Sequence, residues 1–450
     1  MTYDSIPRKA LDTLVLSDGD RRNLSSSIGL VSSGYPDDDM TPLGKRVGRE
    51  RLSDDIHHIS VKDVDARIVE LEEDELAKVG IRSIRLPWAE RRETVTPYWE
   101  KTDFSPDAKL FNQAVANITA SLLRLGTLRP ISVDNAARRS PSNTNLGLPH
   151  LTRNLDIVQE YIDRAKAVKD PADIFPSFAW WRGKVVALGE PIDPGRLVWG
   201  FDHAETYLSG TYLHPAIGTL RRMPEFAAWV GPDGVDDVVR TYIRPFVHNR
   251  EGYAYISVDY SGYDTTISRE AISAVFSVLR SLFVGNDAQL DLIEEIIATS
   301  GLVTPDGWLI GRNGSMPSGT SLTNLIDGIW NLIIIEYCAL RFGAEYRASV
   351  QGDDAIIGTN LKYEDLITGS KELGMVASED KSLESDITAH YLRRLYLMDK
   401  GSPGIYPISR TASSLTGYER FQRDWDENLE AMRTLMLLRI QNITRTKLNL

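Results

Sequence analysis

The most constraining feature of this chain is a glycine turn that carries two adjacent carboxylates. Gln351-Gly352-Asp353-Asp354 stands between two apolar segments, residues 348–350 and 355–357. This pattern predicts a β-hairpin with both acidic side chains at its tip. Carboxylate oxygens suit Mg²⁺, which also needs room for substrate phosphates. Because a Gly-Asp-Asp triplet also occurs in ordinary solvated turns, its meaning depends on the residues that accompany it.

Composition bounds the class of protein. The chain has 450 residues, of which 42% are apolar and 25% charged, enough to bury a sizeable core in one large or several coupled domains. A single cysteine, Cys338, excludes an internal disulfide and a Cys-rich zinc site, and it fits a reducing compartment. The net charge of −12 argues against a surface coated with nucleic acid, although a basic channel inside an acidic exterior would still attract an anionic substrate.

We expect no signal peptide and no membrane span. The longest apolar stretch, residues 326–340, is interrupted by polar residues. Residues 1 to about 60 are rich in Ser, Asp, Gly and Arg and predict an extended or partly mobile arm. His57-His58 lies near its end without a neighbouring cysteine, which argues against a metal site there.

Helical spacing of apolar residues predicts helices over 108–125 and 155–168. Between 175 and 198, Trp180 and Trp181 stand beside cationic residues. Such a pattern is found on RNA-contacting surfaces, and equally at the edge of a core with solvated charges. We leave both interpretations open.

From residue 253 onward, the spacing of apolar residues predicts strands and helices most clearly. A strand over 253–260 places Asp259 near its C-terminal end, and helices are predicted over 268–283 and 289–299. Then follow a hairpin over 302–310 and a glycine-rich loop over 314–319. The loop opens a long helix from Thr320 to Arg341, which Gly343 ends.

The segment after the acidic turn predicts a helix over 363–373 and a short strand over 375–377. A second hairpin is predicted, with strands over 391–398 and 405–408 and its turn at 401–404. An amphipathic helix over 428–440 is expected near the C-terminal end.

Three motifs occur in order along this part of the chain. They are D-x4-D from Asp259 to Asp264, S-G-x3-T-x3-D from Ser318 to Asp327, and Gly352-Asp353-Asp354. In type and order they resemble palm motifs A, B and C of viral RNA-dependent RNA polymerases.

Weaker matches lie outside these three. Thr144 to Pro149 resembles motif G, and Lys184 together with the R-L-V-W-G phrase over 196–200 resembles motif F. Lys381 resembles the motif D lysine, and the segment 391–394 resembles motif E. The R-L-V-W-G phrase and the S-G-x3-T-x3-D pattern are similar to those of picobirnaviruses and partitiviruses, which are bisegmented double-stranded RNA viruses. The resemblance covers about residues 144–410.

The resemblance implies an α+β fold shaped as a right hand, with fingers, a palm whose antiparallel sheet carries the GDD hairpin, and a short helical thumb. The expected divisions are 1–105 (N-terminal arm and fingers–thumb bridging region), 106–250 (fingers), 251–268 (palm, motif A), 269–312 (fingers/palm insertion), 313–400 (palm, motifs B to E) and 401–450 (thumb).

The resemblance also implies roles for individual residues. Asp259, Asp353 and Asp354 would hold two Mg²⁺ ions, which Mn²⁺ could replace, and carry the catalysis with Lys381 as general acid. Lys184 and Arg196 would hold the triphosphate. Ser318 and Gly319 would let the backbone move against template and incoming ribose. Asp264, Thr323 and Asp327 would read the ribose 2′-hydroxyl.

For three of these residues, an ordinary structural role stays open as the alternative. Asp259 could be a strand-end turn residue, Asp264 a local cap, and Lys381 a solvated lysine. Asp327 departs from the Asn found in many positive-strand polymerases. An ionised carboxylate accepts hydrogen bonds but cannot donate one, and it would crowd Asp264 unless a proton or cation intervenes.

The sequence therefore predicts an enzyme that copies a viral, double-stranded RNA genome from ribonucleoside triphosphates. Its expected partners are RNA template and product, the nucleotides and a viral capsid protein, and its expected locations are the virion interior and the host cytoplasm. Two alternatives remain: a reverse transcriptase with the same palm, and an inactive palm protein that binds RNA or capsid.

Overall fold

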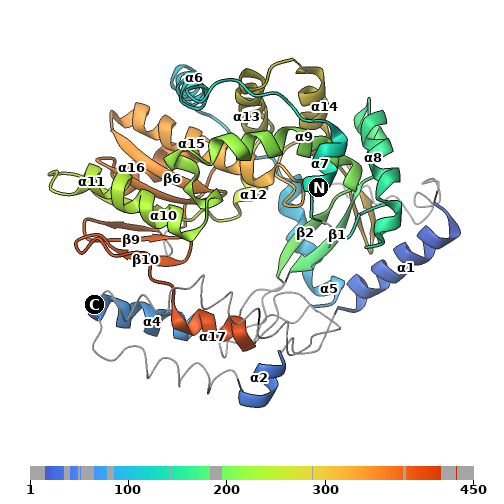
Figure 1. Ribbon diagram of the computed structural model, residues 1–450, viewed down its shortest axis with the longest axis horizontal. Coiled ribbons are helices and arrows are strands. Elements are labelled where there is room, and N and C mark those ends of the chain that lie inside the picture. Colours follow the sequence, from blue (N-terminus) through green and yellow to red (C-terminus); the bar gives the residue numbers. More distant parts are fainter. Residues whose placement is uncertain are drawn as a thin grey trace.

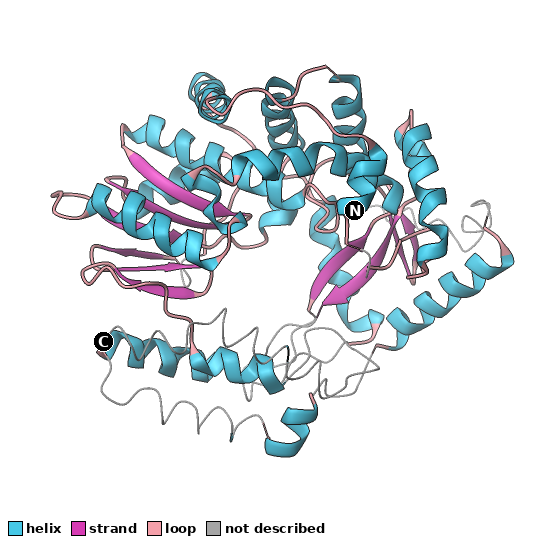
Figure 2. Ribbon diagram, in the orientation of Figure 1, coloured by secondary structure: helices cyan, strands magenta, loops and turns pink. Residues whose placement is uncertain are grey.

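The computed structural model describes residues 16–34, 41–48, 51, 65–78, 86–141, 144–182, 195–285, 287–378, 382–416 and 432. In this part of the chain, helices surround two four-stranded sheets and one two-stranded sheet (Figure 1, Figure 2). The α-helices are α1 (Asp18–Ser33), α2 (Pro42–Val47), α4 (Ala66–Lys78), α5 (Trp88–Arg91), α6 (Ala108–Leu123), α7 (Val133–Arg139), α8 (Val158–Ala167), α9 (His203–Leu220), α10 (Pro232–Val238), α11 (Arg244–Val247), α12 (Tyr263–Thr266), α13 (Arg269–Leu282), α14 (Asp287–Thr299), α15 (Thr323–Phe342), α16 (Tyr363–Glu372) and α17 (Ile408–Thr416). The strands are β1 (Ser177–Arg182), β2 (Arg196–Gly200), β3 (Ala254–Val258), β4 (Leu302–Thr304), β5 (Gly307–Leu309), β6 (Tyr346–Gln351), β7 (Asp354–Thr359), β8 (Leu383–Ser385), β9 (Thr388–Tyr391) and β10 (Arg394–Leu397).

The sheet β6-β7-β3-β8 is antiparallel throughout and contains the predicted acidic hairpin. β6 and β7 pair up to Gln351 and Asp354, which leaves Gly352 and Asp353 as a two-residue turn. On the other side of β7, β3 pairs in a register that ends with Val258 opposite Ala355. The next residue after β3 therefore lies beside the turn, because paired antiparallel strands hold opposite residues at about 5 Å.

Helix α15 packs against β6 of this sheet and against α6, α13 and α16 (Figure 1). Most of its side chains are buried, including Cys338, which is a free thiol. It ends at Gly343, whose φ of 68° is the left-handed conformation that glycine adopts without strain. The helix begins three residues after the predicted Thr320, because Thr320 to Leu322 form a turn.

The second sheet, β2-β1-β4-β5, carries the tryptophans near residue 180. Trp181 is 8% exposed, and the Arg91 guanidinium lies 4.3 Å from its ring centre. Trp180 is half-buried and packs against Phe178. These contacts favour the core-edge interpretation over an RNA-contacting surface.

The predicted extended arm is wrong for residues 16–34 and 41–48, which contain α1 and α2. Ser17 and Asp20 form a capping box that satisfies free N–H groups at the start of α1. Leu24 and Val31 are seven residues apart on one face and are buried. His57 and His58 lie outside the described residues.

The predicted hairpin around residues 401–404 is confirmed only in part. The structure places the turn at Leu392-Arg393, both with positive φ, so β9 and β10 form the hairpin. Of the predicted pairing, only the bridge between Leu395 and Ile405 remains. Similarly, the strand predicted over 375–377 is reduced to one bridge between Tyr260 and Ala377. The helix predicted over 428–440 lies, apart from residue 432, outside the described part of the chain.

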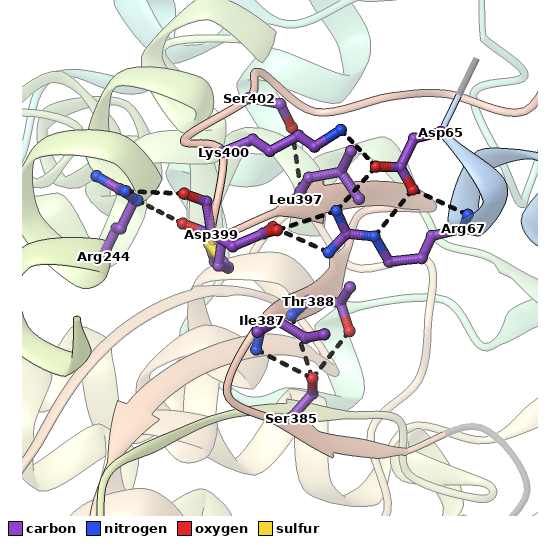
Figure 3. Close-up of polar contacts among 11 residues, drawn as sticks. Asp65, Arg67, Arg244, Ser385, Ile387, Thr388, Leu397, Asp399, Lys400 and Ser402 are labelled. Carbon is purple, nitrogen blue, oxygen red and sulfur yellow. Dashed lines mark hydrogen bonds and ion pairs between the residues drawn. The ribbon is translucent and has the colours of Figure 1, made fainter. Parts of the chain in front are cut away.

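A group of charged residues, here called the junction cluster, joins α4 to the loop after β10 (Figure 3). It consists of Asp65, Arg67, Arg244, Asp399 and Lys400. Beside it, α4 packs against α17, where the buried Glu72 carboxylate accepts hydrogen bonds from the first two N–H groups of α17. This contact fastens α4, in the N-terminal part of the chain, to α17. Among the described helices, none is long and apolar enough to cross a membrane.

Candidate active site

The acidic turn is shaped by Gly352 and held by Asn331. Gly352 has φ of 62°, as the first central residue of a type II′ hairpin turn requires. The Asn331 side-chain amide, on α15, donates to the backbone carbonyls of Gly352 at 3.0 Å and Asp353 at 3.1 Å. One buried amide therefore fixes the turn to the helix that follows the second motif.

Asp259 immediately follows β3 and lies against the segment after α16. Its backbone carbonyl accepts from the Ser378 N–H at 2.8 Å, and its N–H donates to the Ser382 hydroxyl at 3.4 Å. The β3–β7 register places Asp259 beside the acidic turn.

Burial and like charge both act on the carboxylates of the turn. Burial raises the pKa of Asp353, and the Asp259 charge raises it further. Burial likewise raises the pKa of Asp354 to about 7, with the charges of Asp353 and Asp259 adding to the effect. Arg196 lowers both pKa values. Such mutual repulsion favours the binding of protons or cations.

The donor chemistry at the turn fits a hard divalent cation, which prefers carboxylate oxygens. In the described part of the chain, however, no three His, Cys, Asp or Glu side chains lie close enough together to hold a metal ion. The charges of Asp259, Asp353 and Asp354 act on one another. The predicted metal ligands stay a prediction.

Asp264 and Asp327 come together as the sequence predicts. Burial raises the pKa of Asp264 to about 7, with Asp353 adding to the effect and Arg196 opposing it. Asp327 is 4% exposed, and its pKa is raised well above the ordinary value by burial and by Asp264 and Asp353. Among the described residues, no group donates a hydrogen bond to Asp327 Oδ1. The raised pKa values mean that both carboxyl groups take up a proton more readily than ordinary aspartates, which would relieve the expected crowding.

Ser318 and Gly319 lie in a loop that packs against β2, the strand that begins with Arg196. The Ser318 hydroxyl donates to the Leu197 carbonyl at 3.2 Å. A Cβ on Gly319 would lie 1.6 Å from the Trp199 carbonyl oxygen, so no larger residue fits there. The loop before α15, residues 316–322, is named here the motif B loop. Its contact with β2 brings two sets of predicted substrate-binding residues together.

Thr323 starts α15 and faces back into the motif B loop. Its hydroxyl donates to the carbonyls of Thr320 at 2.9 Å and Pro317 at 3.3 Å. Arg196 itself is exposed, and its charge acts on Asp264, Asp353 and Asp354. Lys184 and Lys381 lie outside the described residues.

The predicted motif G segment lies beside the end of β2. A Cβ on Gly147 would be 2.0 Å from the Phe201 carbonyl oxygen, and the Leu146 carbonyl accepts from the His203 N–H at 3.1 Å. The Thr144 hydroxyl and His203 Nε2 are 3.2 Å apart. The segment that resembles motif G therefore packs against the residues that directly follow the motif F phrase of 196–200.

Sequence reasoning missed two positioning residues. Asn331 stands in the apolar helix without an assigned role, although an Asn in such a run is a signal because a buried amide needs partners. Glu205, on α9, is buried and accepts a hydrogen bond from Thr320. The sequence gives no signal for Glu205, because an acidic residue in a helix is unusual only where the helix is buried on most sides, as α9 is.

The chain is similar in sequence to viral polymerases. A family model described as viral RNA-dependent RNA polymerase matches residues 195–403. A potential RNA-dependent RNA polymerase of human picobirnavirus (strain Human/Thailand/Hy005102/-) is 24% identical over 441 residues, or 91% of this chain and 80% of that protein. The RNA-directed RNA polymerase of Cryptosporidium parvum virus 1 is 25% identical over 325 residues, or 65% of this chain and 60% of that protein.

The fold is similar as well. The crystal structure of the RNA-dependent RNA polymerase of a human picobirnavirus superposes with a TM-score of 0.80 at 22% identity, over 96% of this chain and 85% of that one. The predicted right-hand polymerase fold is thereby confirmed, as is the predicted resemblance to picobirnavirus and partitivirus-like polymerases. The class of enzyme is also the predicted one, an RNA-directed RNA polymerase, which is a nucleotidyltransferase.

Proposed function

We propose that this chain adds ribonucleoside triphosphates to a growing RNA strand on an RNA template, and so replicates or transcribes a viral, double-stranded RNA genome. The observation that carries the proposal is the register of β3 against β7, which sets Asp259 beside the Gly352-Asp353 turn. The match of residues 195–403 to viral RNA-dependent RNA polymerases supports it.

Asp259 and Asp353 are the principal ligands in this proposal, with Asp354 secondary. Two Mg²⁺ ions, or Mn²⁺ in their place, would activate the attacking 3′-hydroxyl and neutralise the leaving pyrophosphate. The repulsion among these carboxylates supports the assignment, because it favours cation binding. Asn331 keeps the turn in one position, so that little reorganisation is needed when substrate arrives.

Arg196 holds the triphosphate, with Lys184 as its predicted companion. Its exposed guanidinium and its electrostatic effect on the three acidic residues support this assignment. A planar guanidinium can bind two phosphate oxygens at once. Lys381 is proposed as the general acid that protonates pyrophosphate. Its neighbour Ser382 and the nearby Ser378 both contact Asp259.

Asp264, Thr323 and Asp327 select ribose. A 2′-hydroxyl can donate to one carboxylate and accept from a protonated one, so a proton on one of the two carboxyl groups would give the pair both capacities. This extends the sequence argument, in which an ionised Asp327 could only accept.

The capsid protein as partner, and the virion interior and host cytoplasm as locations, are parts of the same proposal. They rest on the likeness to polymerases of double-stranded RNA viruses.

An incorporation assay tests the proposal. Purified protein is given RNA templates, with and without primer, and either ribonucleotides or deoxynucleotides in the presence of Mg²⁺ or Mn²⁺. We expect ribonucleotide incorporation that Asp353→Ala abolishes while the circular dichroism spectrum is kept. Preference for deoxynucleotides would indicate a reverse transcriptase. Absence of incorporation on every template, with RNA binding intact, would indicate an inactive palm protein.

A further inference from the structure

We propose that Glu205 is a positioning residue for nucleotide selection: its hydrogen bond with Thr320 holds the motif B loop in the conformation that presents Thr323 to the ribose. The inference rests on the polymerase function proposed above and assigns a role to a buried acid outside the predicted motifs.

Glu205 lies in the first turn of α9 and is fully buried. Its Oε1 accepts hydrogen bonds from the Ser209 hydroxyl and the Thr320 hydroxyl, each at 2.6 Å. Its Oε2 has no hydrogen-bond donor among the described residues. An incompletely satisfied buried carboxyl group destabilises a fold. Stability alone therefore does not account for this residue.

Thr320 transmits the contact to the predicted ribose-reading residue. Its carbonyl oxygen accepts from the Thr323 N–H at 3.3 Å and from the Thr323 hydroxyl at 2.9 Å. A shift of Thr320 thus moves both polar groups of Thr323. The Glu205 carboxyl group, which lies on a different element, sets where Thr320 stands.

Three other contacts hold the same loop. The Met316 N–H donates to the Asp264 carbonyl at 2.5 Å. Ser318 is bonded to Leu197, next to Arg196, and Gly319 touches Trp199. The motif B loop is therefore fastened to the residues proposed for ribose and for triphosphate. Of these four contacts, the one between Glu205 and Thr320 joins two side chains, so substitution can break it without altering the backbone.

Ser209 supplies a matched control. It bonds the same carboxyl oxygen at the same distance and is also buried, but it lies four residues along the same helix, and its hydroxyl donates to Glu205 and not to the loop. Thr320→Val and Ser209→Ala each remove one hydroxyl donor to Glu205. If these hydroxyls only satisfy the Glu205 carboxyl group, the two substitutions should have equal effects on nucleotide preference. If Glu205 positions the motif B loop, Thr320→Val should change nucleotide preference more than Ser209→Ala does.

The experiment compares Thr320→Val, Ser209→Ala, Glu205→Leu and Glu205→Gln in the full chain. The readouts are thermal unfolding, KM and kcat for ATP and dATP, and the affinities for both nucleotides with template and primer present. We expect Thr320→Val and Glu205→Leu to reduce the preference for ATP over dATP on the order of tenfold, about the value of one hydrogen bond to a carboxyl group. Ser209→Ala should keep the preference. Glu205→Gln should restore it, because an amide oxygen still accepts from Thr320.

Two outcomes would overturn the inference. One is an equal change in preference for Thr320→Val and Ser209→Ala. The other is an unchanged preference in Thr320→Val and Glu205→Leu at a lowered unfolding temperature. A wild-type protein that incorporates no nucleotide would instead refute the proposed function, while the ratio of the two affinities would still decide the role of Glu205.

Discussion

Two groups of acidic residues in this molecule have opposite surroundings. In the junction cluster, Asp65 lies 2.9 Å from Arg67 and 2.6 Å from Lys400, and Arg67 also pairs with Asp399 (Figure 3). Hydrogen bonds from Arg67 lower the pKa of both Asp65 and Asp399. At the acidic turn, burial and the charges of other carboxylates raise the pKa of Asp353 and Asp354.

The difference separates charges that stabilise the fold from charges kept for binding. The junction cluster gains from ionisation and links α4 to the loop after β10. The acidic turn is destabilised by ionisation, which cations or protons relieve.

Asp353→Asn should reduce nucleotide incorporation roughly 1000-fold, the loss seen when one essential electrostatic group is removed from an active site. The same change should raise the unfolding temperature of metal-free protein, since it removes a repelling charge. Incorporation assays and thermal unfolding would measure the two effects. Asp65→Asn is the control, and it should lower the unfolding temperature while activity per folded molecule persists. A lowered unfolding temperature in Asp353→Asn would contradict the proposed repulsion.

The two groups should also respond oppositely to pH. A carboxyl group with a raised folded-state pKa binds more protons in the folded protein than in the unfolded one, so stability falls as pH rises between the two pKa values. For Asp264 this window runs from the ordinary 3.8 to about 7. Asp65, with its lowered pKa, contributes stability above its ordinary value and loses it at more acid pH.

Asp264→Asn should therefore be more stable than metal-free wild type at pH 7.5, by roughly 4 kcal/mol, and the advantage should vanish near pH 4. Urea unfolding at both pH values measures the difference. A constant difference across the range would show that the Asp264 pKa is not raised by its surroundings.

The acidic turn, one side of this contrast, could be predicted from the sequence because its hairpin is formed by residues that are close together in the chain. Apolar runs on both sides of a glycine turn predict it, and the apolar spacing over 268–283 predicts α13, which begins at Arg269. The clustering of Asp259, Asp264 and Asp327 around the turn followed from the family resemblance, since no spacing rule brings distant segments together.

What the sequence could not show depends on tertiary contacts. Leu392 and Arg393 adopt positive φ although neither is a usual turn residue, so the β9–β10 turn had no local signal. The contact of Glu205 with Thr320 spans 115 positions. The helix α1 was missed for another reason, because its polar composition hid the capping box and the spacing of Leu24 and Val31.

Divalent cations should raise the unfolding temperature through the acidic turn and not through the junction cluster. At ten times its dissociation constant, Mg²⁺ would add roughly 1.4 kcal/mol to the free energy of unfolding. Asp353→Asn should lose this stabilisation and Asp65→Asn should keep it. The measurement is thermal unfolding over a titration of MgCl₂, with matched NaCl as the control for ionic strength. If millimolar Mg²⁺ or Mn²⁺ leaves the wild-type transition unmoved, the carboxylate cluster does not bind them.

The smallest expected effect belongs to Arg67→Ala in the junction cluster. The Arg67 side chain is 23% exposed and that of Asp399 is 40% exposed, so solvent screens the attraction and the loss should be about 1 kcal/mol or less. Arg67→Lys should recover only part of it, because an ammonium group cannot bond both carboxylates in the forked geometry of a guanidinium. Urea unfolding in low and high salt would measure both variants, and the deficit should shrink as salt rises. A salt-independent deficit of several kcal/mol would mean that Arg67 acts through packing, and that the junction cluster stabilises the fold by burial as well as by charge.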